Sequence, residues 1–280
     1  MKTTKLNALL VYPKYPETFW GFNYALPFVN KKASFPPLGL MTVAAMLPKE
    51  WNKRLIDMNV EGDLLEEHIK WADIVLVSAM IVQKKSVKEV IARCKEKNKL
   101  VVAGGPLFTA MPEHFKEVDH LILNEAEITL RPFLQDLANN KAEHIYTSEV
   151  KPDLYDTPIP LWSLINPDNY MTMAIQFSRG CPHNCKFCDI AATFGRLPRT
   201  KTTIQIIEEL EALRKIGWRG TVFFADDNII GYRKNFEGML PRLIDWQIEH
   251  DYPVKLMSQA TVLLANDEKL MNLMSQANFF

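Results

Sequence analysis

The sequence carries no excess charge of either sign and has no long apolar stretch. Lysine plus arginine equals aspartate plus glutamate at 33 each, and this balance argues against electrostatic capture of nucleic acid or of an anionic membrane. No apolar run approaches the ~20 residues that a membrane-spanning helix needs, and no signal-peptide pattern is evident at the start. With 48% hydrophobic and 24% charged residues, the composition is that of a globular protein.

Cysteine is also scarce, yet three of the four cysteines lie in one short loop. Cys181, Cys185 and Cys188 are spaced Cys-x3-Cys-x2-Cys. Three closely spaced thiolates can hold three corners of a four-iron cluster and leave the fourth iron open. A structural zinc site is a weaker alternative, because it needs four closed ligands and only His183 lies nearby. A disulfide framework is disfavoured, since three cysteines cannot pair off and Cys94 lies in an ordinary helical stretch.

Residues 1–145 read as a parallel α/β domain, because short apolar strands alternate with helical stretches. The expected strands are Leu6–Tyr12, Arg54–Asp57, Ile74–Ser78, Leu100–Ala103 and His120–Leu123. The expected helices are Pro37–Leu47, Leu64–Lys70, Lys85–Lys97 and Thr129–Leu137. Five strands with crossovers predict a doubly wound domain of the Rossmann or flavodoxin-like kind. Such domains bind ligands at the carboxyl ends of their strands.

Residues 146–170 contain four prolines and no sustained periodicity, which predicts an irregular linker. Residues 171–280 then read as three βα units. The expected elements are strands Thr172–Phe177, Thr221–Ala225 and Val254–Ala260 and helices Thr203–Ile216, Asn235–Glu249 and Asp267–Ala277. Asp226, Asp227 and Asn228 end the second of these strands, at the mouth where βα barrels perform their chemistry. A helix cap with a solvated acid explains these three residues equally well.

The cysteine loop follows an apolar strand and has Phe187 just before its last cysteine. In these features it resembles the signature of the radical S-adenosylmethionine (SAM) superfamily. The resemblance implies a βα barrel whose 4Fe-4S cluster, held by the three loop cysteines, binds SAM and cleaves it to a deoxyadenosyl radical. It further implies that Phe187, Asp226, Asp227 and Asn228 contact SAM.

The strand ends of the first domain resemble the cobalamin-binding domain that precedes many radical SAM cores. The matching stretches are 78–83, 104–106 and 125–127, although two glycines after a strand equally fit a plain tight turn. The stretch 57–62 imitates the Asp-x-His-x-x-Gly cobalamin motif, but it follows the second strand and has Asn in place of His. Asn59 is therefore expected to line the pocket without binding cobalt. The residues expected to bind cobalamin are Asn59, Ser78, Gln83, Gly104, Gly105, Pro106 and Glu125.

Further stretches at 35–40, 176–181 and 217–220 resemble the cobalamin-dependent radical SAM group that includes the hopanoid C-2 methyltransferases. The resemblance implies methyl transfer to an unactivated carbon of a lipid-like small molecule, with electrons from a donor such as flavodoxin or ferredoxin. Free cysteines and an oxygen-sensitive cluster fit the cytoplasm. A cyclisation or rearrangement without methyl transfer remains an alternative, as does a non-catalytic, cofactor-binding fragment.

The sequence departs from this group in several places. Asn124 and Asn278 stand where the group has glycine, and Asn is the residue that best replaces glycine at a positive φ. Gln259 stands where relatives tend to carry an acid. The sequence ends at Phe280, where a fourth barrel strand is expected to begin, as a shortened reading frame or a split gene would produce. We therefore expect about half a barrel, with the 254–260 strand as an open edge.

Overall fold

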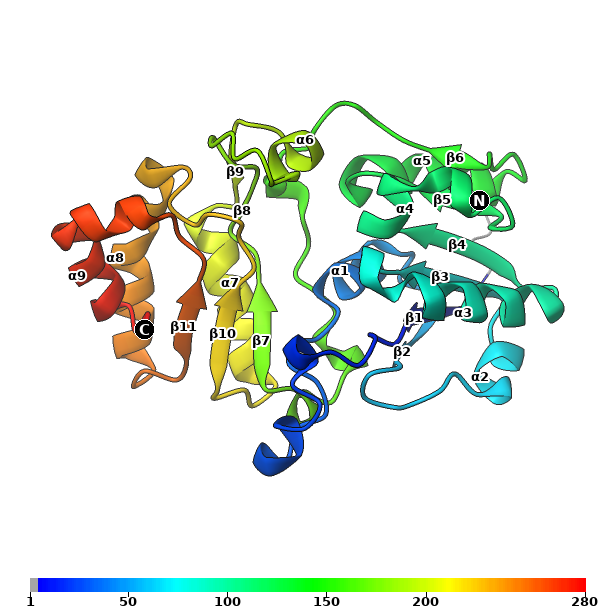
Figure 1. Cartoon of the computed structure of the whole chain (residues 1–280), viewed down its shortest axis with the longest axis horizontal. Helices are drawn as coiled ribbons and strands as arrows, with labels where there is room; N and C mark the ends of the chain where they lie inside the picture. Colours follow the sequence, from blue (N-terminus) through cyan, green and yellow to red (C-terminus); the bar gives the residue numbers. More distant parts are fainter. Residues whose placement is uncertain (1–4) are drawn as a thin grey trace. The chain divides into compact units, whose positions relative to one another are not determined.

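The computed structural model describes residues 5–280, and the chain divides into two compact units (Figure 1). The first comprises Met1–Pro152 with Ser163–Asn169, and the second comprises Asp153–Trp162 with Tyr170–Phe280. The proline-rich segment is thus shared between the units. Within residues 5–280, no helix combines the length and the apolar character that crossing a membrane requires.

A six-stranded parallel sheet forms the centre of the first unit, in the order β2-β1-β3-β4-β5-β6. Its strands are β1 (Asn7–Tyr12), β2 (Asn52–Asp57), β3 (Ile74–Ser78), β4 (Leu100–Gly104), β5 (His120–Ile122) and β6 (Ile145–Tyr146). The doubly wound α/β fold is confirmed, but the expectation of five strands is wrong. The sixth strand has only two residues, and a stretch that short carries no detectable period of two.

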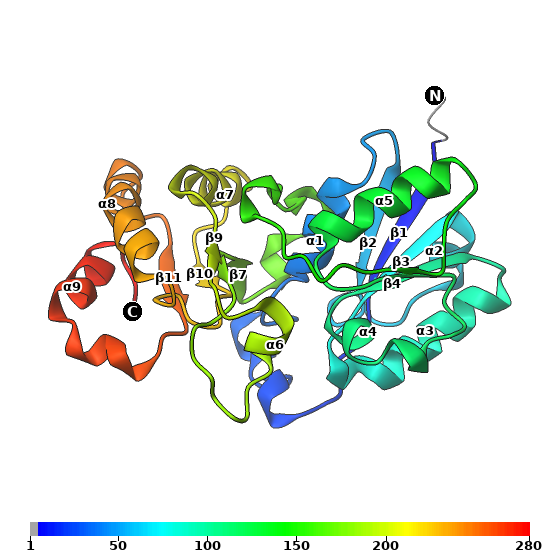
Figure 2. The same cartoon turned by 90° about the horizontal axis from the view of Figure 1, so that it is seen from above.

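Helices cover both faces of this sheet, α1 and α5 on one and α2, α3 and α4 on the other (Figure 2). Their bounds are α1 (Leu38–Met46), α2 (Glu66–Trp71), α3 (Lys84–Glu96), α4 (Pro106–Ala110) and α5 (Ala126–Ala138). The apolar stripe of α3, with Val87, Val90 and Ile91, packs into one buried core with alternate strand residues such as Val75 and Val77. Short 3-10 turns occupy Phe19–Gly21, Leu26–Val29, Ile81–Gln83 and Pro112–His114.

The second unit contains three parallel strands in the order β11-β10-β7, joined by helices as in consecutive βα units of a barrel. The strands are β7 (Thr172–Ile175), β10 (Thr221–Phe224) and β11 (Lys255–Ser258), and a two-residue pair is formed by β8 (Ser178–Arg179) and β9 (Arg199–Thr200). The helices are α6 (Ile190–Phe194), α7 (Thr203–Lys215), α8 (Arg233–Glu249) and α9 (Glu268–Gln276). Short 3-10 turns of this unit occupy Leu154–Asp156 and Val262–Asn266, while the turn Trp162–Leu164 spans the division between the units and Pro167–Asn169 belongs to the first unit.

The outer edge of β11 is paired at one residue, Leu256, so the expectation of a wholly open edge was wrong. The amide of Leu256 donates to the carbonyl of Asn278 at 2.9 Å, and the amide of Phe280 donates to the carbonyl of Leu256 at 3.1 Å. These bonds give a parallel bridge between Leu256 and Phe279. The ring of Phe279 also packs against Phe224, with the ring centroids 5.5 Å apart. The last three residues therefore lie along β11 and supply partners to its backbone.

Candidate functional site

The cysteine loop begins where β7 leaves the sheet and is closed at its base by the antiparallel pair of β8 and β9. Gly180 lies just inside this base with a φ of +96°, and a Cβ there would come within 2.9 Å of the carbonyl oxygen of Gly195. Glycine is therefore required at this position. Beside it, the amide of Cys181 donates to the same carbonyl at 3.2 Å. The first cysteine is thus held by the backbone of the far side of the loop.

The three loop thiols are free, and two of them, Cys185 and Cys188, are exposed, while Cys181 is half-buried. Within residues 5–280, no three side chains of His, Cys, Asp or Glu come close enough together to hold a metal ion. The loop thus carries three sulfur donors on one short segment, but their sulfur atoms do not surround a common point. Cys94 differs, because its thiol is buried in the core of the first unit and burial raises its pKa to about 11.

Asp226 follows β10 and is buried, with 1% of its surface exposed. Its Oδ2 accepts the amide of Phe177 at 3.0 Å, and its Oδ1 accepts the amide of Ser178 at 2.5 Å. Oδ1 also accepts the hydroxyl of Ser178. Burial raises the pKa of Asp226 to about 6, although these three donors act in the opposite direction. Both oxygens of this expected SAM contact are therefore engaged with the start of the cysteine loop.

The other expected SAM contacts lie in different surroundings. Phe187 is 94% exposed on the cysteine loop. Asp227 is half-buried, and burial raises its pKa, with a further contribution from the negative charge of Asp189. Asn228 is buried, and its Oδ1 accepts the amide of Thr261 at 3.2 Å. Of these side chains, Phe187 is exposed and Asp227 is half-buried.

A cavity of about 160 Å³ lies beside the cysteine loop at the carboxyl ends of β10 and β11. Pro182 and His183 of the loop line one side, and Asn228 and Thr261 line another. The Oγ1 atom of Thr261 is buried and has no hydrogen-bond partner within residues 5–280. The cavity therefore joins the cysteine loop to the end of β10.

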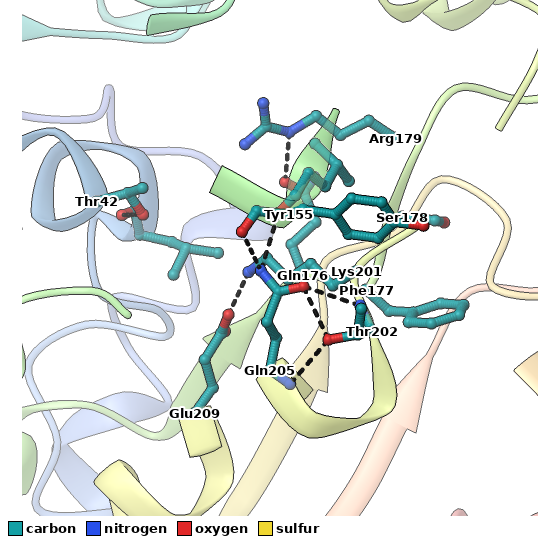
Figure 3. A network of polar contacts seen from close by, with 12 residues as sticks. Thr42, Tyr155, Gln176, Phe177, Ser178, Arg179, Lys201, Thr202, Gln205 and Glu209 are labelled. Atoms are coloured by element: carbon teal, nitrogen blue, oxygen red, sulfur yellow. Dashed lines mark hydrogen bonds and ion pairs between the residues drawn. The ribbon is translucent and has the colours of Figure 1, made fainter. Parts of the chain in front are cut away.

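A buried ion pair near the base of the loop was missed by the sequence analysis. Lys201 follows β9 and pairs with Glu209 of α7, and both side chains are at most 4% exposed (Figure 3). The amide of Lys201 also donates to the carbonyl of Phe177 at 2.8 Å. Glu209 lies on the same helix face as the apolar stripe of α7, where Ile206 and Leu210 are buried. That position on an apolar face was the signal available in the sequence.

The segment 153–162 is attached to α7 by Gln205, as Figure 3 shows for Tyr155. The Nε2 of Gln205 donates to the carbonyls of Leu154 at 2.9 Å and Tyr155 at 3.1 Å. The same side chain accepts the amide of Thr202, and the Thr202 hydroxyl accepts the amide of Gln205. This reciprocal capping fixes the start of α7, and Gln205 thereby fixes the segment that precedes β7.

At the carboxyl edge of the large sheet, two expected cobalamin residues hold the loop after β1. Gln83 is buried and donates to the carbonyl of Pro13, while its Oε1 accepts the amide of Met80 at 2.7 Å. Asn59 donates to the same Pro13 carbonyl at 3.2 Å and accepts the amide of Tyr15 at 2.8 Å. Both side chains therefore shape this edge through contacts with the protein.

Gly104 and Gly105 leave no room for a side chain. A Cβ on Gly104 would come within 2.7 Å of the carbonyl oxygen of Ile122 in β5, and one on Gly105 within 2.6 Å of the hydroxyl of Ser78. Gly105 also has a φ of +91° and a ψ of −175°. Bulky substitutions here would strain the sheet edge before reaching any ligand. Loss of ligand binding in such variants would therefore not identify a ligand contact.

The remaining expected cobalamin residues stand at two helix starts. Pro106 is exposed and opens α4, and Glu125 is buried and precedes α5. Asn124, one of the two glycine replacements, has a φ of +61°, and the other, Asn278, has a φ of +69°. The prediction that asparagine replaces glycine at a positive φ is confirmed at both positions.

Two family models match the chain, one in each half. A B12 binding domain matches residues 28–134, and the Radical SAM superfamily matches residues 175–278. The chain therefore combines a B12-binding domain with a radical SAM domain. The pair of domains inferred from the strand ends and the cysteine loop is confirmed.

Among curated proteins, the chain is 44% identical over 276 residues to an uncharacterized methyltransferase of Synechocystis sp., covering 98% of this chain and 51% of that protein. It is 35% identical over 281 residues to the hopanoid C-2 methylase of Rhodopseudomonas palustris, covering 99% of this chain and 53% of that protein. The chain thus spans about half the length of these relatives.

Among solved structures, the radical SAM methyltransferase TsrM from Kitasatospora setae, with tryptophan and a SAM analogue bound, superposes with a TM-score of 0.75 at 16% identity. That alignment covers 98% of this chain and 58% of TsrM. The cobalamin-dependent SAM radical enzyme OxsB, with aqua-cobalamin bound, gives a TM-score of 0.68 at 18% identity, covering 98% of this chain and 41% of OxsB. At these identities the likeness concerns the fold.

Proposed function

We propose that this chain forms the cofactor-binding part of a cobalamin-dependent radical SAM enzyme that methylates an unactivated carbon. The observation that carries the proposal is the three-thiol loop at the carboxyl end of β7, in a chain that also contains a B12-binding domain. The identity to hopanoid C-2 methylase extends over both domains and supports methyl transfer as the reaction class.

The donor set of the loop fits an iron–sulfur cluster. Three free thiols lie on one segment, and the exposed Cys185 and Cys188 can turn inward without unpacking a core. Three thiolates leave one iron of a four-iron cluster open, and such a cluster supplies the electron that cleaves SAM. Cys181, Cys185 and Cys188 would hold it. Cys94 would not take part, because burial keeps it a neutral thiol.

For SAM, the fitting groups are Asp227, the exposed Phe187 and the cavity beside Asn228. Asp227 can meet the ammonium group of SAM with a carboxylate. For cobalamin, we propose the carboxyl edge of the six-stranded sheet, where Ser78 and Pro106 are accessible and where Gln83 and Gly105 shape the turns. The protein positions these cofactors and excludes water, while the cofactors supply the reactivity.

The proposed substrate is a lipid-like molecule of the hopanoid type, a choice supported by the relative named for hopanoid C-2 methylation. The reaction also needs one-electron donation, for which flavodoxin or ferredoxin is the expected partner. We place the reaction in the cytoplasm, because free thiols and an oxygen-sensitive cluster require a reducing compartment.

The test begins with anaerobic reconstitution of the 280-residue chain with iron and sulfide. We expect about four iron atoms per wild-type chain, a loss of loading on Cys181→Ala, and unchanged loading on the matched control Cys94→Ala. Cobalamin should remain bound through gel filtration. Absence of iron from the wild type, or loss of iron from the Cys94 variant, would overturn the cluster assignment.

The reaction class is tested with methyl-labelled SAM, a chemical reductant and a hopanoid. Label recovered in the hopanoid supports methyl transfer. A hopanoid that is altered without label supports a rearrangement instead. An unaltered hopanoid together with cleaved SAM would contradict the proposed substrate class but leave the cofactor assignment standing.

A further inference from the structure

The position of Asp226 after β10 suggests that it contacts a ligand, but its hydrogen bonds indicate a structural role. Its carboxylate is buried, and its hydrogen bonds run to Phe177 and Ser178, which lie between the end of β7 and the first cysteine of the loop. The hydroxyl of Ser178 adds a third donor to the same carboxylate. The side chain is thus engaged with its own chain at the point where that chain leaves the sheet.

This junction needs a partner because the strand ladder ends there. The amide of Ala225 still donates to the carbonyl of Ile175 at 2.7 Å, which continues the pairing of β10 with β7. Beyond it, the amides of Phe177 and Ser178 find no strand on that side and bond to Asp226 instead. Buried amide groups without acceptors are costly, so the carboxylate takes over the role of the missing strand.

The hydrogen bonds of Asp226 also affect the cysteine loop, because Phe177 and Ser178 lie directly before it. The base of the loop is the two-residue pair of β8 and β9, of which Ser178 is the first residue. The next contact inward is the bond from Cys181 to Gly195. The sequence from 177 to 181 therefore forms one short connection from the Asp226 carboxylate to the first cysteine, and Cys185 and Cys188 beyond it are exposed.

We propose that Asp226 is a positioning residue that holds the base of the cysteine loop, and that it does not bind SAM. This inference rests on the proposed function for the assignment of the loop as a cluster-binding loop. The hydrogen bonds of Asp226 do not depend on that assignment. A carboxylate suits the role because both of its oxygens accept hydrogen bonds. Asparagine has the same shape but replaces one acceptor with an NH₂ group, which would face a backbone donor.

The test compares wild type with Asp226→Asn, with Asp227→Asn as the matched control one residue away. The first readout is hydrogen exchange of peptides spanning residues 176–182 in protein without added iron. We expect exchange at least tenfold faster in Asp226→Asn and unchanged in Asp227→Asn. Equal protection of these amides in wild type and Asp226→Asn would overturn the proposal, whatever cofactor the chain binds.

The second readout is the lifetime of the reconstituted cluster in the presence of an iron chelator, together with SAM binding by equilibrium dialysis. Asp226→Asn should lose iron at least tenfold faster, and Asp227→Asn should keep the wild-type lifetime and bind SAM more weakly. A normal lifetime in Asp226→Asn combined with tenfold weaker SAM binding would show a ligand contact and overturn the inference. A wild-type chain without iron would instead overturn the proposed function.

Ser178→Ala provides the milder variant if Asp226→Asn does not fold. It removes only the hydroxyl bond to Asp226 and leaves both amide bonds in place. We expect exchange of the 176–182 peptides to rise at least twofold, with the rest of the chain unchanged. If Asp226→Asn does not fold and the exchange rate of the 176–182 peptides is unchanged in Ser178→Ala, the proposed positioning role of Asp226 is refuted.

Discussion

Four glycines of the first unit differ in backbone φ and in the space available for a Cβ atom. Alanine substitutions at these positions can therefore measure the cost of each factor separately. Gly39 in α1 has an ordinary φ and open space around a Cβ, and Gly62 has a φ of +85° with open space. Gly104 has an ordinary φ but would place a Cβ against the carbonyl oxygen of Ile122, and Gly105 combines a positive φ with close contact to Ser78. Alanine substitutions at these positions should therefore give four different results.

The expected magnitudes follow from these surroundings. Gly39→Ala should stabilise by up to about 1 kcal/mol, because alanine is the better helix former. Gly62→Ala should cost about 1–2 kcal/mol for a left-handed backbone alone. Gly104→Ala should cost about 1–3 kcal/mol, because the atom it meets belongs to the backbone of a paired strand. Gly105→Ala should cost about 2–5 kcal/mol, the sum of a glycine-only conformation and a steric contact.

The assay is native-state hydrogen exchange of peptides covering β3 and β4 in the full chain. This local measurement is preferable because two units need not unfold in a single transition. Adding Ser78→Ala to Gly105→Ala removes the atom in contact and should recover the steric part of the cost while leaving the conformational part. A Gly105→Ala cost no larger than that of Gly62→Ala would refute the reasoning about Ser78.

The series also determines how cobalamin binding should be tested at this edge. Since substitutions at Gly104 and Gly105 are expected to strain the sheet, a loss of binding there is ambiguous. Pro106 is exposed at the start of α4, so Pro106→Ala leaves the sheet intact. Weaker cobalamin retention in Pro106→Ala, with unchanged exchange in β4, would be specific evidence for a ligand at this edge.

Three further predictions concern buried charges and the odd cysteine. Lys201→Met should cost about 3–5 kcal/mol by leaving Glu209 buried without its partner, and a Lys201→Met, Glu209→Leu double variant should recover most of this loss, as measured by exchange in α7. Burial raises the pKa of Asp226 from 3.8 to about 6, so the folded state holds the proton more tightly than the unfolded state. As the pH rises from 4 to 6, the free energy of unfolding should therefore fall by about 2 kcal/mol relative to Asp226→Asn, and a flat difference would contradict this. Cys94 should resist alkylation at neutral pH in the folded protein, while Cys185 should react within minutes.

Much of the architecture could be predicted because the governing interactions are local. The strand β3 has the same bounds in the structure as in the prediction, α7 differs by one residue at its end, and α3 differs by one residue at each end. Apolar periodicity and a capping threonine are properties of neighbouring residues, so they can be read without the fold. The positive φ at Asn124 and Asn278 was also predictable, because few residue types tolerate that conformation.

The roles of individual charged residues could not be predicted in the same way. Asp226 and Asp227 are adjacent in the sequence and chemically identical, yet one is 1% exposed and bonded to the strand end while the other is half-buried. What separates them is the end of the ladder between β7 and β10, a contact between residues 48 or 49 positions apart. No local pattern contains that information.

By itself, then, the sequence determined the two domains, their cofactor motifs and most helices and strands, because spacing and periodicity are properties of the chain alone. The tertiary structure decided which polar groups face the protein and which face a ligand. Gln83, Asn59 and Asp226 were expected at ligands, and each is occupied by backbone groups from another element. Lys201 and Glu209 are only eight positions apart, but the burial of their ion pair depends on the fold packed around α7. Burial and hydrogen-bond partners depend on contacts between distant segments, and these exist only in the folded chain.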